Sequence, residues 1–98
     1  MYIIKHLDEF NDWLNSIKDN TVRLRLARRL DKAARGLLGD VEPVGDGVSE
    51  MCEHFGAGWR MYYVTRGNEL VIMLGGGNKS SQSKNIKIVK QRAKQLED

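Results

Sequence analysis

The fold is decided by residues 48–74, VSEMCEHFGAGWRMYYVTRGNELVIML, in which β-prone runs alternate with short polar turns. The connections at Gly56–Gly58 and Arg66–Glu69 are short enough for β-hairpins, which predicts three consecutive antiparallel strands. The third run is continuously apolar, as is typical of a central strand covered on both faces. In chain order the runs are Val48–Phe55, Trp59–Thr65 and Leu70–Leu74.

Upstream of this stretch the apolar residues follow helical periodicity. A first amphipathic helix is predicted from Asp8 to about Lys18. A second helix follows the N-cap candidates Asp19 and Asn20, and the short connection between the two predicts a helical hairpin. The apolar positions that define the two helices are Phe10, Trp13, Leu14, Ile17, Val22, Leu26, Leu30, Ala33 and Leu37.

The remaining segments complete an α+β pattern. Tyr2–Lys5 predicts a short opening strand, and Leu38–Gly47, which contains the only proline, predicts a polar turn region. Gly75–Asn78 is expected to end the last strand, and a final helix should begin at about Ser81. The order β-α-α-β-β-β-α predicts an α+β fold, with an N-terminal helical hairpin on one face of a twisted, largely antiparallel sheet and a C-terminal helix. The residues that this last helix should bury are Ile86, Val89, Ala93 and Leu96.

Length and composition limit the class of protein. Residues 1–98 are expected to form one domain, because so short a chain cannot divide into two hydrophobic cores. The composition, 41% hydrophobic and 30% charged, argues against disorder. No apolar run approaches the roughly 20 residues of a membrane-spanning helix, and the N-terminus lacks a secretory-signal pattern. The single cysteine, Cys52, cannot alone form an internal disulfide or a structural zinc site. The expected location is the cytoplasm, with no metal, cofactor or membrane contact.

Positive charge is concentrated in two segments, although the net charge is only +3. Arg23–Arg35 and Lys79–Lys94 each carry six basic residues, so together they hold 12 of the 16. Such segments can place a positive field over a phosphate chain. They are equally compatible with solvated helix faces, and charge alone leaves both interpretations open.

Five motifs occur in order along almost the whole chain. They are Phe10-x-x-Trp13-Leu14, Gly36-x-x-Gly39-Asp40, Gly47-Val48-Ser49-Glu50, Gly56-x-Gly58-Trp59-Arg60-Met61-Tyr62-Tyr63 and Gly75-Gly76-Gly77-Asn78-Lys79-Ser80-Ser81-Gln82. With this ordered set the chain resembles the RelE/ParE toxin superfamily, and within it the HigB-like branch of addiction module killer proteins. The resemblance implies a RelE-like fold and cleavage of messenger RNA in the ribosomal decoding site. It also implies a cognate antitoxin, a helix-turn-helix protein encoded by the adjacent gene.

Alternation along the strands divides their side chains between two faces. The mostly apolar face should meet the helical hairpin, and it carries Met51, Phe55, Trp59, Met61 and Tyr63. Glu53 falls on the same face, where a charged residue is not expected. The opposite face is the candidate site, with Lys79 arriving from the loop after the last strand. It gathers Glu50, Cys52, His54, Arg60 and Tyr62.

RNA cleavage of the implied kind uses the substrate's own 2′-hydroxyl to attack the adjacent phosphate. The protein must then move protons and stabilise an over-charged phosphorane. Arg60 suits the phosphorane, because its planar guanidinium can bind two phosphate oxygens. Lys79 and His54 complete the candidate catalytic set, as a second cation and a proton-exchanging group, and Glu50 is expected to support Arg60. The candidate substrate-binding residues are Cys52, Tyr62, Gln82 and Lys84.

Several of these residues also have ordinary structural interpretations. Arg60 could form a surface ion pair, and Lys79 could belong to a plain loop, since the spacing of a P-loop is absent. His54 could be an exposed structural histidine. Tyr62 could serve packing, and Gln82 could begin the last helix.

Cys52 departs from the family pattern, which has an arginine after Ser-Glu-Met, and a thiol cannot supply a permanent positive charge to a phosphate. An attenuated toxin that retains only antitoxin binding is therefore one alternative. A ParE-like protein that poisons gyrase without nuclease chemistry is another. A nucleophilic Cys52 is disfavoured, because only His54 lies nearby in sequence. Because Cys52 and Arg60 are expected on an exposed face, replacing either should change stability by no more than about 1–2 kcal/mol.

Overall fold

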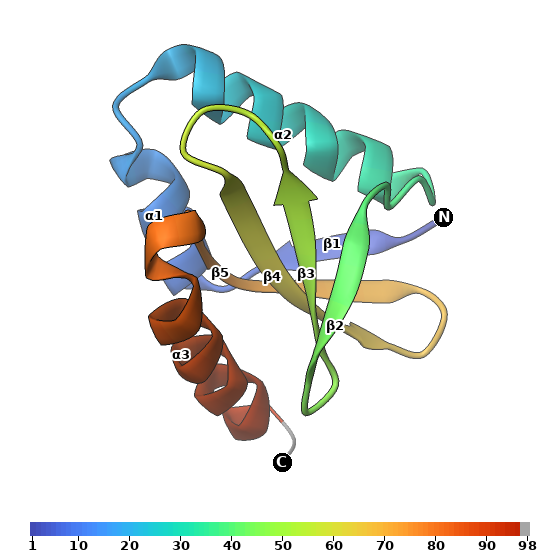
Figure 1. Ribbon diagram of the computed structural model, residues 1–98. Helices are drawn as coiled ribbons and strands as arrows, with labels where there is room; N and C mark the ends of the chain where they lie inside the picture. Colours follow the sequence, from blue (N-terminus) through green and yellow to red (C-terminus); the bar gives the residue numbers. More distant parts are fainter. Residues whose placement is uncertain (97–98) are drawn as a thin grey trace.

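A five-stranded mixed sheet separates three helices into two layers in the computed structural model, which describes residues 1–96 (Figure 1). The class is α+β, as predicted. A single turn of 3-10 helix, Lys79–Ser81, precedes the last helix. The other elements in chain order are β1 Ile3–His6, α1 Asp8–Ser16, α2 Asn20–Ala34, β2 Val41–Gly45, β3 Val48–Glu53, β4 Trp59–Arg66, β5 Leu70–Gly77 and α3 Gln82–Gln95.

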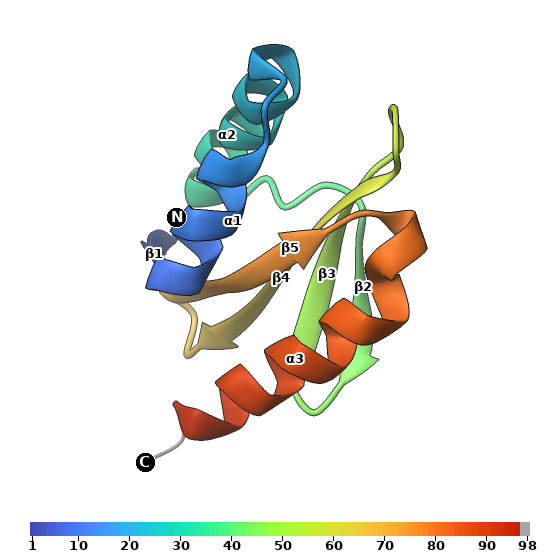
Figure 2. The same cartoon turned by 90° about the vertical axis from the view of Figure 1, so that its left-hand side faces the viewer.

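The strands lie in the order β1-β5-β4-β3-β2. From β2 to β5 each strand pairs antiparallel with the next, and β1 alone pairs parallel, with β5. The prediction of a largely antiparallel sheet built on consecutive hairpins is therefore confirmed. Figure 2 shows α1 and α2 on one face of the sheet and α3 on the other. β5 consequently has helices on both faces, as its apolar run predicts.

Side chains that alternate along β3 and β4 enter two separate cores. Met51, Met61 and Tyr63 are buried with Phe10 and Leu26 under α1 and α2. The opposite side of the sheet has its own core under α3, made by Val48, Tyr62, Val64, Leu74, Val89 and Ala93. The predicted phase of β3 is confirmed, since Met51 and its neighbours Glu50 and Cys52 face opposite sides of the sheet.

The prediction of a polar turn region at Leu38–Gly47 is wrong, because β2 lies within it. β2 pairs only with β3, and Pro43 is tolerated because an edge strand leaves one row of amides unpaired. Asp46 and Gly47 both have positive φ angles, 56° and 78°, and connect the two strands. An Asp-Gly pair is a strong hairpin signal, so the sequence held evidence for this strand.

The prediction that the triple glycine ends the last strand is wrong, because β5 continues through it to Gly77. The reason is space. A Cβ on Gly76 would overlap the ring of Trp13, and one on Gly75 would lie 2.7 Å from Nη1 of Arg92. The two helical layers approach the sheet so closely here that only glycine fits on the strand between them.

The structure also tests the predicted cap and the predicted buried stripe of α2. Asp19 caps α2 and accepts from the backbone N–H groups of Thr21 and Val22, as expected. Leu37 was placed in the buried stripe but is 63% exposed, since α2 ends at Ala34. No helix within residues 1–96 has the length and apolar character needed to span a membrane.

Candidate functional site

A buried carboxylate on β3 organises the candidate site. Glu50, on β3, is only 3% exposed. Its Oε2 accepts a hydrogen bond of 3.0 Å from Nε2 of Gln82, the first residue of α3. The same oxygen lies 3.5 Å from Nε of Arg60 on the neighbouring strand, in a pair whose side chains are 4% and 12% exposed. Gln82 therefore begins α3, as predicted, and also orients the carboxylate that holds Arg60.

Lys79 lies close to Arg60 because both residues contact the loop that joins β3 and β4. A Cβ on Gly58 would lie 3.2 Å from Cβ of Lys79 and 3.3 Å from Nη1 of Arg60. The loop fixes both residues: Nη1 of Arg60 donates to the carbonyl of Gly58 at 2.9 Å, and the amide of Lys79 donates to the carbonyl of Ala57 at 3.2 Å. The side chain of Asn78 caps the turn that carries Lys79. The structure thus places the aliphatic stem of Lys79 close to the guanidinium of Arg60.

His54 is paired with the carboxylate of Asp40, for which no role was predicted. Its Nε2 lies 2.5 Å from Oδ2 of Asp40, and both side chains are exposed. The carbonyl of Asp40 accepts from the amide of Cys52, and Cys52 is the β3 partner of Arg60. Asp40, immediately before β2, therefore lies in a row with Cys52 on β3 and Arg60 on β4, with Asp40 and Arg60 roughly 10 Å apart at their Cα atoms. Asp40 was visible in the motif Gly36-x-x-Gly39-Asp40, and its contact with His54 was not.

Tyr62 and Cys52 are more buried than a substrate-contacting role requires. The Tyr62 side chain belongs to the core under α3, and burial together with the charge of Glu50 raises the pKa of its phenol. Cys52 is 6% exposed. Burial raises the pKa of its thiol to about 11, aided by a 3.4 Å hydrogen bond to Oε1 of Glu50 and by the charge of that carboxylate. The packing interpretation of Tyr62 is supported, and Cys52 is a neutral thiol at physiological pH.

We expect Cys52 to be almost inert toward alkylating reagents in the folded protein. Raising a thiol pKa from 9.0 to about 11 lowers the thiolate fraction near neutral pH by about 100-fold, and burial restricts access further. Mass spectrometry after iodoacetamide treatment measures the rate. That rate should rise about tenfold per pH unit up to pH 11, and unfolding in urea should restore ordinary reactivity. Rapid labelling of native protein at pH 7 would contradict the buried thiol and reopen a nucleophilic role.

Arg29 was counted among the basic residues of a surface segment but is a buried structural residue, 9% exposed. Its guanidinium donates to the carbonyl oxygens of Leu38, Asp40 and Cys52 and, at 3.0 Å, to Oε1 of Glu53. This pair explains the unexpected charge of Glu53 on the apolar face. Its spacing from Leu26 and Ala33 places Arg29 on the inner side of α2, but nothing in the local sequence indicates the distant groups with which it pairs.

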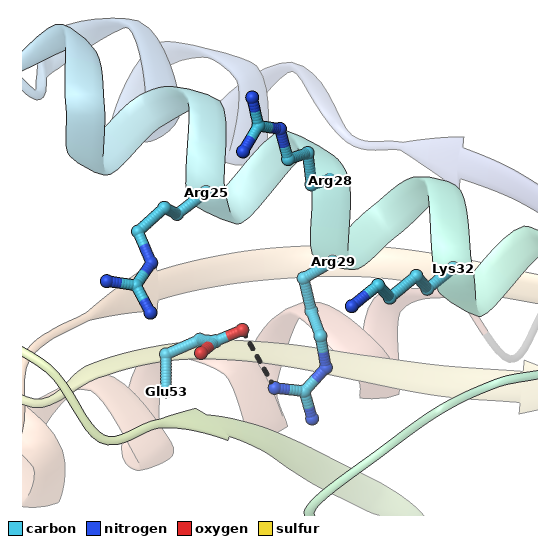
Figure 3. Close-up of a pocket in the computed structure, with 5 residues that line it drawn as sticks. All are labelled: Arg25, Arg28, Arg29, Lys32 and Glu53. Carbon is cyan, nitrogen blue, oxygen red and sulfur yellow. Dashed lines mark hydrogen bonds and ion pairs between the residues drawn. The ribbon is translucent and has the colours of Figure 1, made fainter.

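An open groove of about 230 Å³ lies on the outer side of this pair, between α2 and the end of β3 (Figure 3). Figure 3 shows Arg25 and Arg29 reaching from α2 toward Glu53, with Arg28 pointing away from Glu53. The guanidinium of Arg25 also stacks on the ring of Phe55, with 4.0 Å from its Cζ to the ring centroid. The residues that line the groove are Arg25, Arg28, Arg29, Lys32 and Glu53.

The structure thus assembles most, but not all, of the predicted site residues. Glu50, Cys52, Arg60 and Gln82 form one buried cluster with Lys79 at its edge. The predicted open face is largely covered, however, because α3 packs on the same side of the sheet as Tyr62. The prediction that Cys52 and Arg60 lie on an exposed face is therefore wrong. The small stability effects expected for replacing them rested on that exposure. Lys84 is exposed on the first turn of α3. Within residues 1–96 no three His, Cys, Asp or Glu side chains lie close enough together to hold a metal ion.

Comparison with known proteins identifies one clear relative. An uncharacterized protein of Haemophilus influenzae is 36% identical to this chain over 93 residues, which span 95% of this chain and 94% of the relative. No family model matches the chain. Identity at this level over almost the full length of both chains indicates common descent and a shared fold.

Proposed function

We propose that this chain, which belongs to the same family as the Haemophilus influenzae protein, is the toxin of a type II toxin-antitoxin pair of the RelE/ParE superfamily, in its HigB-like branch. In this proposal it is a cytoplasmic endoribonuclease that cleaves messenger RNA bound to the ribosome and needs no cofactor. The observation that supports it most is the position of Arg60, held by the buried Glu50 with Lys79 beside it. An arginine fixed in this way, with a lysine side chain beside it, suits a phosphorane that gains charge during the reaction.

The second support is the pair formed by Asp40 and His54. A carboxylate on one imidazole nitrogen sets the orientation of the ring and leaves the other nitrogen free to exchange a proton. We propose that His54 takes the proton of the attacking 2′-hydroxyl or delivers one to the leaving 5′-oxygen, while Arg60 binds the phosphate. This proposal uses a single histidine, so the ribosome must supply part of the orientation, an effect that can itself be large.

Expression of the gene alone, and together with its neighbour, tests the proposal. Expression alone should stop growth and produce new messenger RNA ends at translated positions, and the neighbouring gene should relieve both effects by supplying a tight, salt-sensitive partner. Purified protein should cut messenger RNA on translating ribosomes much faster than free RNA. Equal rates on free RNA would contradict ribosome dependence. Gyrase-dependent DNA breaks without RNA cleavage would favour the ParE-like alternative.

Cys52→Arg should increase toxicity, because Cys52 lies beside Arg60 and a third cation there would add a charge-assisted phosphate contact. Such a contact is worth about 2–4 kcal/mol, or roughly 30- to 1,000-fold in rate. The measurement is transformation efficiency without the antitoxin gene, with Cys52→Met as the uncharged control of similar length. Because Cys52 is buried and Glu50 lies 3.4 Å from its thiol, the new guanidinium would compete with Arg60 for Glu50, so the melting temperature of the variant is measured in parallel. Unchanged toxicity with an intact melting curve would show that this position contributes no phosphate contact.

A further inference from the structure

We propose that the groove on α2 is a second RNA-binding site, which holds single-stranded RNA outside the bond that is cut. This inference rests on the proposed function, because it assigns the groove to the same RNA substrate. Of the basic side chains that line the groove, Arg25, Arg28 and Lys32 are exposed. The donors of Arg29 are directed to backbone carbonyls and to Glu53, so its charge is already matched inside the fold. Three exposed cations remain for a ligand.

The spacing of these cations favours a phosphodiester chain over a compact anion. Arg25 and Lys32 are seven residues apart on one helix, which is about 10 Å along the axis. The inner wall of the groove carries the Glu53 carboxylate, whose side chain is 21% exposed and would repel a phosphate ion bound deep between the cations. A chain that crosses the outer rim meets successive positive charges and avoids that carboxylate. Such contacts supply affinity independent of sequence.

The pair of Arg25 and Phe55 adds a feature that suits unpaired bases. The guanidinium of Arg25 lies over the Phe55 ring and Arg25 is exposed, so the pair can present a planar cation to a ligand. Unstacked RNA bases stack on aromatic rings and on arginine planes, whereas bases within a duplex are not available for this. Single-stranded RNA is therefore the ligand that uses every feature of the groove.

The groove and the candidate site lie on opposite faces of the same end of β3. Glu53 on the groove wall and Cys52 beside Arg60 are consecutive residues, and their β4 partners are Trp59 and Arg60. The loop between β3 and β4 carries Phe55 to the groove and Gly58 to the candidate site. An RNA strand that passes around this loop can contact both. The groove would thus hold nucleotides that flank the reacting phosphate.

The test measures binding of a short single-stranded RNA with 2′-O-methyl riboses, which cannot be cleaved by its own 2′-oxygen. For Arg28→Ala/Lys32→Ala the slope of log affinity against log salt should fall by about 1.4, since each lost contact to single-stranded nucleic acid lowers it by about 0.7. Arg25→Lys keeps the charge but loses the plane, so its affinity should fall about fivefold or more at an unchanged slope. Lys87→Ala/Lys94→Ala removes two exposed charges from α3 and is the matched control.

Equal losses in the α2 and α3 double variants would reduce the effect to net charge and overturn the inference. Absence of RNA binding by the unaltered protein, or a groove that prefers an acidic peptide to RNA, would also overturn it. Messenger RNA cleavage on ribosomes is measured in parallel. If the α2 variants bind RNA normally while Arg60 variants lose cleavage, the groove is not an RNA-binding site and the proposed function is retained. If the α2 variants lose RNA binding but the unaltered protein never cleaves messenger RNA, the groove is an RNA-binding site and the proposed nuclease function is rejected.

Discussion

Loss of the Arg60 guanidinium should abolish growth inhibition and lower the rate of messenger RNA cleavage by about 30- to 1,000-fold, or about 2–4 kcal/mol in the transition state. Arg60→Ala alone is an ambiguous test. It leaves Glu50 buried without its cation, at a cost of about 3–5 kcal/mol in stability. Glu50→Gln/Arg60→Gln is sharper, because replacing both members of a buried pair by neutral groups often costs little.

Glu50→Gln is the matched control, because it keeps the arginine and removes only the carboxylate that orients it. We expect a smaller loss of cleavage for this variant than for the double variant, and a lower melting temperature, because Glu50→Gln leaves the mostly buried Arg60 without its anion. Arg60→Lys should restore only part of the rate, since an ammonium cannot bind two phosphate oxygens side by side. Full toxicity in a folded Glu50→Gln/Arg60→Gln protein would remove Arg60 from the reaction and with it the main support for a nuclease.

Arg29→Met should destabilise the fold by about 3–5 kcal/mol without removing any side chain of the candidate site. The change leaves the Glu53 carboxylate without its cation and removes the guanidinium donors of three backbone carbonyls, of which that of Asp40 still accepts from the amide of Cys52. It also opens a space above Gly39, where a Cβ would lie only 3.0 Å from Nη2 of Arg29. For a chain of this length, the loss corresponds to a drop of more than about 10 °C in Tm.

Arg28→Met is the control for this prediction, because Arg28 is the next residue on α2 and is exposed. Its stability should stay within about 0.5 kcal/mol of the unaltered protein. Thermal unfolding followed by circular dichroism measures both variants. Equal melting temperatures for the two would mean that Arg29 makes no net contribution and that its contacts do not order the segment from Leu38 to Asp40.

The strands of the hairpin series could be predicted from the sequence because their evidence is local. A period of two along residues 48–65 places Met51 and Met61 on one face and Glu50 and Arg60 on the other, and the structure confirms that division. The helical stripe and the Asp19 cap rest on equally local preferences. The strand β2 was missed even though Asp46-Gly47 signals a hairpin, because Pro43 and the polar composition around it favoured a turn.

The face that α3 covers is a matter of tertiary packing. The period of a helix indicates which of its sides is apolar, but not which side of the sheet receives it. Because α3 packs against Tyr62 and Leu74, the face that was expected to be open around Arg60 is largely covered. The same packing holds the triple glycine in β5, where turn propensity predicted a break. At these glycines the close approach of Trp13 and Arg92 outweighs the turn propensity of the local sequence.

The sequence by itself determined the α+β class, the order of the main elements and the residue types from which a phosphate-binding site could be built. Only the tertiary structure decided which charges are free. Arg28 and Arg29 are adjacent and chemically identical, yet one is exposed and the other is buried against Glu53. The difference arises because the partners of Arg29 lie 9 to 24 residues away along the chain. Burial and pairing depend on contacts between distant segments, and these exist only after the helices have packed on the sheet.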